Sequence, residues 1–97
     1  MKYGLKQEYL FRISNIIKSN KKIRRVLIFG SRAKGNYKEG SDIDVCLEAD
    51  DLSLSELNNI RFNLDELLLP YKIDIIDMNF ISNIDLKEHI LRVGKEI

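Results

Sequence analysis

A Gly-Ser step followed by a pair of aspartates constrains the fold of this chain more than any other feature. Gly30 and Ser31 follow the apolar run 23–29 (IRRVLIF), and after ten further residues Asp42 and Asp44 lead into a second apolar run. Runs rich in Ile, Val, Leu and Phe on either side of a Gly-containing connection predict two short strands. A Gly-Ser step at the end of a strand presents backbone N–H groups and a hydroxyl, which together bind phosphate. Two aspartates at alternate strand positions point to one face, with Cα atoms about 6.5–7 Å apart.

The remaining secondary structure follows from hydrophobic periodicity and from residues that start or stop helices. Helical spacing predicts helices over about 4–19, 53–68 and 82–93, and apolar runs predict strands over about 23–29, 42–48 and 71–77. Ser53 and Glu56 have the spacing of a capping box at the start of the middle helix, and Pro70 stops that helix. The apolar positions predicted to face the core are Tyr9, Leu10, Ile13, Ile16, Ile17, Leu57, Ile60, Leu64, Leu67, Leu68, Leu86, Ile90 and Val93.

The order of these elements predicts an α+β fold in a single domain, residues 1–97. The helix over 53–68 is long enough to cross over the sheet, so strands 42–48 and 71–77 should be parallel neighbours. We therefore expect a two-layer α/β arrangement, in which a small mixed β-sheet carries its helices mainly on one face. The other face of the sheet would then be open for chemistry.

A third aspartate extends the carboxylate pair. Asp74 lies inside the apolar run YKIDIID, where an unpaired charge is costly to bury. If the two strands are neighbours, Asp74 stands beside Asp42 and Asp44, and the three carboxylates repel one another unless a cation neutralises them. Mg²⁺ prefers oxygen ligands and completes its shell with water and phosphate oxygens. Asp42, Asp44 and Asp74 are therefore the predicted catalytic and metal-binding residues. They would hold two Mg²⁺ ions that activate a hydroxyl and stabilise a leaving pyrophosphate.

The nucleotide would lie against the Gly-Ser step. Gly30, Ser31 and Arg32 are the predicted nucleotide-binding residues, because a cation beside the step can offset triphosphate charge. A cation on a turn is also commonly just solvated, and that alternative stays open for Arg32. Two other phosphate motifs are excluded. A P-loop needs Lys-Ser/Thr where Asn36-Tyr37 stands, and no G-x-G-x-x-G occurs.

The charge balance and the cysteine content limit which classes of partner and which cellular compartment are expected. Sixteen basic and fifteen acidic side chains leave a formal net charge of +1, so no broad attraction to nucleic acid or to a membrane is predicted. No apolar run approaches the roughly 20 residues of a membrane span, and the first residues lack the apolar core of a signal peptide. Cys46 alone cannot form an intramolecular disulfide, which favours a reducing cytoplasm. Lys21, Lys22, Arg24 and Arg25 form a basic cluster that is either a solvated edge or a surface for an acidic partner.

The run GSRAKGNYKEGSDIDVCL, with KIDIID downstream, resembles the minimal nucleotidyltransferases (MNT) of the DNA polymerase β-like superfamily. The resemblance covers nearly the whole chain, and the spacing from Gly-Ser to Asp-x-Asp is a specific signal. It implies the nucleotidyltransferase fold and the transfer of a nucleoside monophosphate, usually AMP from ATP, with two Mg²⁺ ions. By position, Gly30 and Ser31 would grip the triphosphate. Asp42 and Asp44 would bind metal, and Asp74 would be the third carboxylate.

The resemblance also implies a partner. Many members of the family are antitoxins encoded beside a HEPN-domain ribonuclease, which they silence by adding AMP groups to a tyrosine. The leading hypothesis is therefore AMP transfer to a hydroxyl of a partner HEPN-type toxin, with which the chain would form a hetero-oligomer. One departure from the family is Lys34, which stands where members often have a second arginine and lacks the bidentate fork of that residue.

Two alternatives stay open at this point. The first is a non-catalytic antitoxin that neutralises its partner by contact alone. The second is a nucleotidyltransferase for a small molecule such as an antibiotic. A chain of 97 residues has no second domain to build a pocket for a small acceptor, which favours a macromolecular one.

Overall fold

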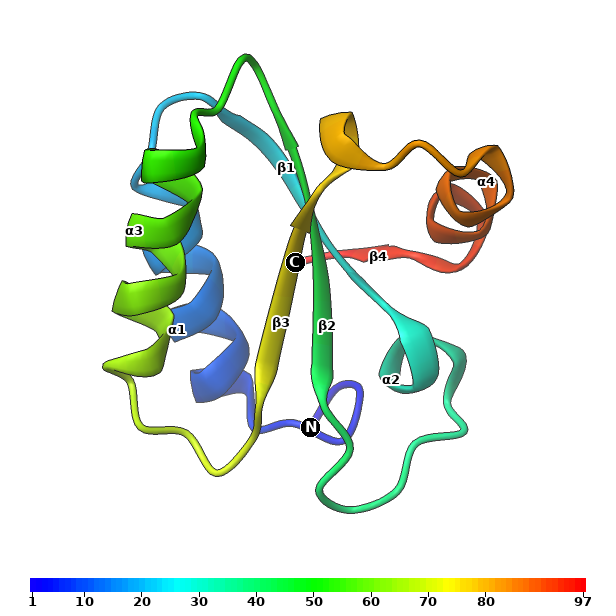
Figure 1. Cartoon of the computed structure of the whole chain (residues 1–97). Helices are drawn as coiled ribbons and strands as arrows, with labels where there is room; N and C mark the ends of the chain where they lie inside the picture. Colours follow the sequence, from blue (N-terminus) through cyan, green and yellow to red (C-terminus); the bar gives the residue numbers. More distant parts are fainter.

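The computed structural model describes all residues 1–97, and the chain alternates between helices and strands (Figure 1). Its elements are α1 (Gln7–Lys18), β1 (Ile23–Phe29), α2 (Gly30–Lys34), β2 (Ile43–Ala49), α3 (Leu54–Asp65), β3 (Ile73–Asp77), the 3₁₀-helix η1 (Met78–Phe80), α4 (Ile84–Val93) and β4 (Lys95–Glu96). Every helix and strand predicted from the sequence is present, and α2, η1 and β4 are additional. None of the helices combines the length and the apolar character that crossing a bilayer requires.

The central strand β2 decides the topology of the sheet. The strand order is β3-β2-β1-β4, with β2 antiparallel to β1 and parallel to β3, and with β4 antiparallel to β1. The parallel pair confirms that α3 is a crossover, because a tight turn cannot join two parallel strands. The predicted small mixed sheet of an α+β fold is therefore confirmed. The sequence does not predict β4, because its two residues, Lys95 and Glu96, are both charged and carry no strand pattern.

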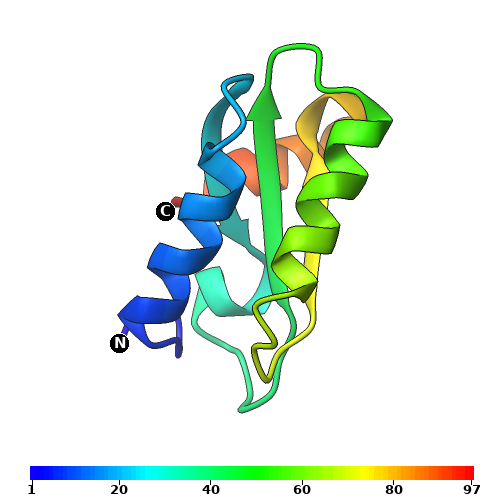
Figure 2. The same cartoon turned by 90° about the vertical axis from the view of Figure 1, so that its left-hand side faces the viewer.

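The two longest helices cover one face of the sheet. Figures 1 and 2 show α1 and α3 side by side on that face. Val26 and Ile28 of β1 and Val45 and Leu47 of β2 point into this layer and are fully buried. Burying an aliphatic side chain of this kind stabilises a fold by about 1.5–3 kcal/mol. The main core therefore lies on the side away from the predicted chemistry.

The opposite face is only partly open. A smaller cluster there joins the sheet to α4 and the segment before it, through Leu27, Cys46, Ile81 and Ile90. Burial, with smaller effects from nearby carboxylates, raises the pKa of the Cys46 thiol to about 12, so this cysteine is an inert part of the packing. Figure 1 shows α4 beside one end of the sheet and α2 beside the other. The open face predicted from the sequence is thus confined to the end where α2 begins.

Two residues predicted to face the core are exposed instead. Leu68 is 87% exposed, because α3 ends at Asp65 and Leu68 takes a positive φ of 53° in the following turn. The helical spacing on which its prediction rests has already stopped there. Leu86 is 37% exposed, because Ile90 is the residue through which α4 packs on the sheet. The predicted start of the first helix at residue 4 is also early, since Lys2 and Leu5 close a turn before α1.

The basic cluster at the start of β1 is largely neutralised within the protein. Three of its four members form ion pairs with acidic side chains of β2, of the loop after it and of α3. These pairs are Lys22 with Glu56, Arg24 with Asp50 and Arg25 with Glu48. The cluster is therefore a paired edge of the fold, and most of its charge is not free for an acidic partner.

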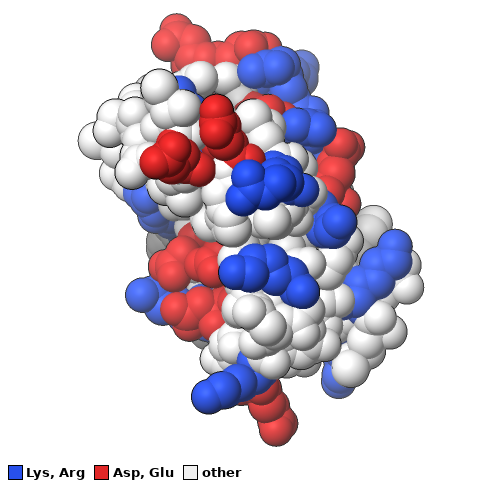
Figure 3. All heavy atoms as spheres, turned by 90° about the vertical axis from the view of Figure 1, so that its right-hand side faces the viewer, with Lys and Arg blue, Asp and Glu red and all other residues white.

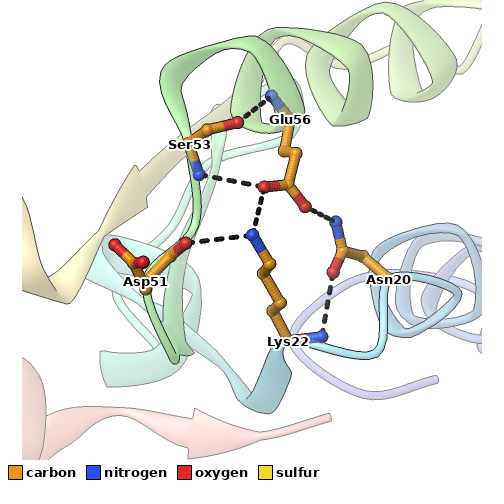
Figure 4. A network of polar contacts seen from close by, with 5 residues as sticks. All are labelled: Asn20, Lys22, Asp51, Ser53 and Glu56. Atoms are coloured by element: carbon orange, nitrogen blue, oxygen red, sulfur yellow. Dashed lines mark hydrogen bonds and ion pairs between the residues drawn. The ribbon is translucent and has the colours of Figure 1, made fainter.

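Glu56 is the centre of a polar network that ties the turn before β1 to the start of α3 (Figure 4). The Glu56 N–H donates to Ser53 Oγ at 3.0 Å, and the Ser53 N–H donates to Glu56 Oε1 at 3.2 Å, which is the predicted capping box. Lys22 Nζ lies 2.6 Å from the same oxygen, and Asn20 Nδ2 donates to Oε2 at 2.9 Å. The Lys22 contact first, and then the other donors, lower the pKa of Glu56 to about 2.

This network predicts a specific acid sensitivity. The folded-state pKa of Glu56, about 2, lies below its ordinary value of 4.5, so the stabilisation is complete above pH 4.5 and is lost as the pH falls through about 2. We expect the free energy of unfolding of the wild-type protein, measured by urea titration, to fall more steeply across this window than that of Glu56→Gln. Glu66→Gln changes an exposed glutamate beyond α3 and should follow the wild type. Equal slopes for wild type and Glu56→Gln would contradict the assignment.

Candidate active site

The backbone of Gly30 passes directly against the carboxylate of Asp44. β1 ends at Phe29, and Gly30 begins α2 with a φ of +73°, a left-handed conformation that favours glycine. A Cβ atom at this position would clash with Asp44 Oδ2 and would lie 3.3 Å from Asp44 Cγ. Any other residue would therefore strain the backbone and push the carboxylate away. The fold thus brings the Gly-Ser step and the second aspartate of the pair together.

The three predicted carboxylates lie at the same end of the sheet. Asp44 of β2 and Asp74 of β3 are direct partners in the parallel ladder, so their side chains share one face. Asp42 is exposed and lies just before β2. Partial burial, followed by the charges of Asp74 and Asp42, raises the pKa of the Asp44 carboxyl above its usual range. The repulsion among these groups that the sequence predicts is therefore present.

Lys72 is a residue at this site that the sequence analysis misses. Its Nζ lies 3.6 Å from Asp74 Oδ1, and its charge lowers the pKa of Asp44, the smallest of the four effects on that group. Both members of the pair are largely exposed, so the pair contributes at most about 1 kcal/mol. The sequence does indicate this ion pair, because Lys72 and Asp74 are two positions apart in an extended segment and so lie on the same side. The lysine partly compensates the negative charge of the site.

The donor set at this site suits Mg²⁺. No three acidic, histidine or cysteine side chains converge closely enough to hold a metal ion by themselves. Asp44 and Asp74 do supply neighbouring carboxylate oxygens. Burial first, and then the charges of Asp74 and Asp42, raise the pKa of Asp44, and a divalent cation would relieve the repulsion among these charges. Mg²⁺ commonly binds through one or two carboxylates and takes its other ligands from water and substrate phosphates. The residues therefore fit magnesium together with a nucleotide, and not a cage built by the protein alone.

Arg32 belongs to the scaffold around the site. It is 2% exposed, and its Nε and one terminal nitrogen donate to the Ser41 carbonyl at 3.1 and 2.8 Å. The other terminal nitrogen donates to the Tyr3 carbonyl at 3.0 Å. The guanidinium carbon lies 5.1 and 4.8 Å from the ring centroids of Tyr37 and Tyr71. A contact between Arg32 and a nucleotide stays a prediction.

The carboxylates lie on an open edge and not in an enclosed pocket. β3 is an edge strand, and Asp74 on it is exposed. The three surface cavities of the molecule are lined by other residues, and none includes Asp42, Asp44 or Asp74. Figure 3 shows acidic and basic side chains interspersed on the side of the molecule that carries α2 and α4, with no broad patch of one sign. An open site of this kind suits a reacting group that is carried by a large partner.

Comparisons with known proteins identify the family that this chain resembles. Residues 12–97 match the sequence profile of the family described as "Polymerase beta, Nucleotidyltransferase". A candidate protein adenylyltransferase of Methanocaldococcus jannaschii is 35% identical over 85 residues, which cover 87% of this chain and 86% of the relative.

Solved structures share the fold at lower sequence identity. A candidate minimal nucleotidyltransferase superposes with a TM-score of 0.75 at 23% identity, covering 100% of this chain and 97% of that one. A toxin–antitoxin structure with AMP-PNP gives a TM-score of 0.73 at 23% identity, covering 95% of this chain and 72% of that one. A tri-AMPylated Shewanella oneidensis HEPN toxin in complex with an MNT antitoxin gives 0.62 at 22% identity, covering 91% and 70%. At these identities the matches confirm the nucleotidyltransferase fold and no more.

Alanine at Gly30 should destabilise the protein more than alanine at Gly35. Both glycines have a positive φ, +73° and +87°, but a Cβ at Gly35 would meet nothing within 4 Å, whereas one at Gly30 would clash with Asp44. We expect Gly30→Ala to lower the free energy of unfolding by about 1–3 kcal/mol more than Gly35→Ala does, because it adds overpacking to the same backbone strain. Urea denaturation measures both. Equal losses would mean that the Asp44 carboxylate moves aside without cost.

Asparagine at Asp44 should stabilise the protein when no metal is bound. Because the pKa of Asp44 is raised above its usual 3.8, its ionised form destabilises the fold, and this effect develops as the pH rises through the folded-state pKa. In EDTA at pH 7 we expect Asp44→Asn to raise Tm, with the gain shrinking as the pH falls toward 3.8. Asp65→Asn, at the exposed end of α3, is the control and should leave Tm unchanged. A lower Tm for Asp44→Asn at pH 7 would show that the carboxylate is stabilising.

Proposed function

The chain belongs to the polymerase β nucleotidyltransferase family, and on this basis we propose that it transfers AMP from ATP to a hydroxyl of a partner HEPN-type toxin. The proposed acceptor is a tyrosine hydroxyl, and the proposed role is that of the antitoxin in a toxin–antitoxin pair. One observation carries the proposal: Gly30 contacts Asp44, and Asp74 stands beside Asp44 on the next strand. This contact supports a nucleotide site, because it joins a phosphate-binding backbone to two carboxylates.

ATP is the proposed substrate and Mg²⁺ the proposed cofactor, with two ions per site. Bound magnesium would neutralise the carboxylates and polarise the phosphoryl group that is transferred. Asp42 and Asp44 would hold the ions, and Asp74 would share the one nearer to the acceptor. Gly30 and Ser31, at the start of α2, would donate backbone N–H groups to the triphosphate. The toxin–antitoxin structure with AMP-PNP, which has a similar fold, supports an adenine nucleotide.

The proposed reaction exchanges a phosphoanhydride linkage of ATP for a phosphate ester of the acceptor. The acceptor oxygen forms a bond to the α-phosphorus of ATP, and the bond from that phosphorus to the bridging oxygen breaks, so that pyrophosphate leaves. Asp74 is exposed on the edge strand, where an incoming hydroxyl has access to it. Asp74 would accept the proton that the hydroxyl loses.

A protein acceptor is favoured over a small molecule. The carboxylates lie outside every cavity of the molecule, so nothing around them would hold a small acceptor in place. The candidate protein adenylyltransferase of M. jannaschii and the tri-AMPylated HEPN toxin support the same choice. The proposed compartment is the cytoplasm, where ATP is abundant and where the free, buried Cys46 stays reduced.

Covalent transfer predicts that a silenced partner stays silent after separation. We expect the intact mass of the toxin to rise by one or more AMP units after incubation with this protein, ATP and Mg²⁺. Asp44→Asn should still bind the toxin and should give background labelling, because it loses the charge that holds the cation. The matched control is Asp65→Asn, which changes an exposed aspartate on α3 and should label the toxin at the wild-type rate.

Neutralisation by contact alone predicts the opposite set of results. The toxin would show no change in mass, would recover its activity once the two proteins are separated, and would be silenced fully by Asp44→Asn. An unmodified but silenced toxin would therefore overturn the enzymatic proposal in favour of a binding module.

A further inference from the structure

Arg32 joins four segments of the chain that meet at the end of the sheet where the carboxylates lie. It belongs to α2, and it donates to the carbonyl of Tyr3 in the turn before α1 and to that of Ser41 in the loop before β2. The ring of Tyr71, just before β3, lies against its guanidinium. It is also the only basic residue of the chain that is buried. Burying a charge is costly unless hydrogen bonds compensate it, so this arrangement calls for an explanation.

Arg32 makes most of its hydrogen bonds with Ser41, the residue before Asp42. Two guanidinium nitrogens of Arg32 donate to the same oxygen, the Ser41 carbonyl, at 3.1 and 2.8 Å. The Ser41 N–H donates to the Lys38 carbonyl at 3.0 Å, and the Lys38 N–H donates to Ser41 Oγ at 2.8 Å. The loop is therefore closed on itself and then fastened to α2 by Arg32. These bonds fix the direction in which the backbone enters Asp42.

Aromatic rings hold the guanidinium in that orientation. Its carbon lies 5.1 Å from the Tyr37 ring and 4.8 Å from the Tyr71 ring, within the range of a cation–π contact. Tyr71 is itself packed edge-on against Tyr9 of α1, with ring centroids 6.1 Å apart. A flat, forked cation satisfies the rings and the carbonyls together, whereas lysine offers neither the plane nor the fork. Through Tyr71 the same side chain braces the segment that leads into Asp74.

We propose that Arg32 is a positioning residue, which sets the two backbone segments that enter Asp42 and Asp74 and does not itself bind the nucleotide. Three of its N–H groups are engaged by backbone carbonyls. Arginine carries five N–H groups, so two remain, but the residue is 2% exposed and its guanidinium packs against two rings, which leaves little of it to a phosphate in solution. This inference rests on the proposed function, because the geometry that Arg32 sets is the one that magnesium and ATP would use.

The test separates binding of the phosphates from placement of the carboxylates. The variant is Arg32→Lys, which keeps the charge and loses the fork, and the control is Arg12→Lys on the exposed side of α1. The first measurement compares backbone amide NMR spectra in EDTA. The second measures the affinity for a non-hydrolysable ATP analogue, AMPCPP, in EDTA and in Mg²⁺, from the shifts of the Gly30 and Ser31 amides.

We expect Arg32→Lys to move the amide signals of Asp42 and Asp74 in EDTA and to leave that of Gly30 in place. The affinity for AMPCPP in EDTA should stay within about twofold of the wild type, while the gain in affinity on adding Mg²⁺ should fall by about 10-fold or more. Arg12→Lys should match the wild type in both measurements. A loss of affinity in EDTA as large as that in Mg²⁺ would make Arg32 a phosphate ligand and overturn the proposal. Unchanged spectra and affinities would overturn it as well.

A second variant covers the case in which Arg32→Lys does not fold. Tyr71→Leu leaves Arg32 in place and removes one ring that orients it, so it should reduce the Mg²⁺-dependent gain in the same direction. An unchanged gain for Tyr71→Leu would then contradict the proposal. If the wild-type protein itself shows no Mg²⁺-dependent gain, the proposed function is wrong. In that case the NMR spectra in EDTA are the only test of the positioning role of Arg32. Displaced Asp42 and Asp74 signals would support that role, and unmoved signals would refute it.

Discussion

The ladder of hydrogen bonds on both sides of β2 is the interaction on which the rest of this molecule depends. β2 is antiparallel to β1 and parallel to β3, so one strand brings together the end of β1 and the start of β3. Phe29 is opposite Asp44 in the first ladder, and Asp74 is opposite Asp44 in the second. The residue after Phe29 is the glycine that contacts the Asp44 carboxylate. A shift of one residue in either register would turn alternate side chains to the other face and would dismantle the site.

The two faces of the sheet contribute to the stability of the fold with opposite signs. On the side of α1 and α3 the strands bury aliphatic side chains, and the Glu56 network fastens the helix layer at its far end. On the other side Asp44 is partly buried beside two like charges, a combination that raises the pKa of its carboxyl and works against folding while the group is ionised. The compact helix layer thus stabilises a sheet whose opposite surface is held in an unfavourable electrostatic state. That division lets one small sheet carry both the main aliphatic core and a cluster of carboxylates.

Local patterns predicted the elements well, and contacts between distant segments account for what was missed. Pro70, the capping box and the apolar runs mark the middle helix and the strands because each acts over a few residues. The position of Arg32 could not be predicted in this way, because its partners Tyr3 and Tyr71 lie far from it in sequence. Its charge beside a Gly-Ser step predicted a phosphate contact, which stays a prediction, and three of its N–H groups donate to backbone carbonyls.

The acidic residues also differ in whether their surroundings follow from local sequence patterns or depend on contacts between distant segments. The pairing of Asp44 with Asp74 follows from the crossover rule, so the sequence was sufficient for it. Asp77 ends β3, and one of its oxygens accepts from the Asn79 N–H as the N-cap of η1. Its second oxygen is buried without a partner, which no local pattern indicates.

The placement of β3 at the edge of the sheet has a consequence for how such a domain changes its target. Arg61 of α3 donates to the Ile75 carbonyl, which covers part of the free edge, while Asp74 beside it remains exposed. An acceptor group approaching along this edge needs no pocket to receive it. Under the proposed function, the choice of acceptor would be made by whichever surface docks the partner, away from the carboxylates. That surface could then change, and with it the modified protein, while the carboxylates and the loop around them stay unchanged.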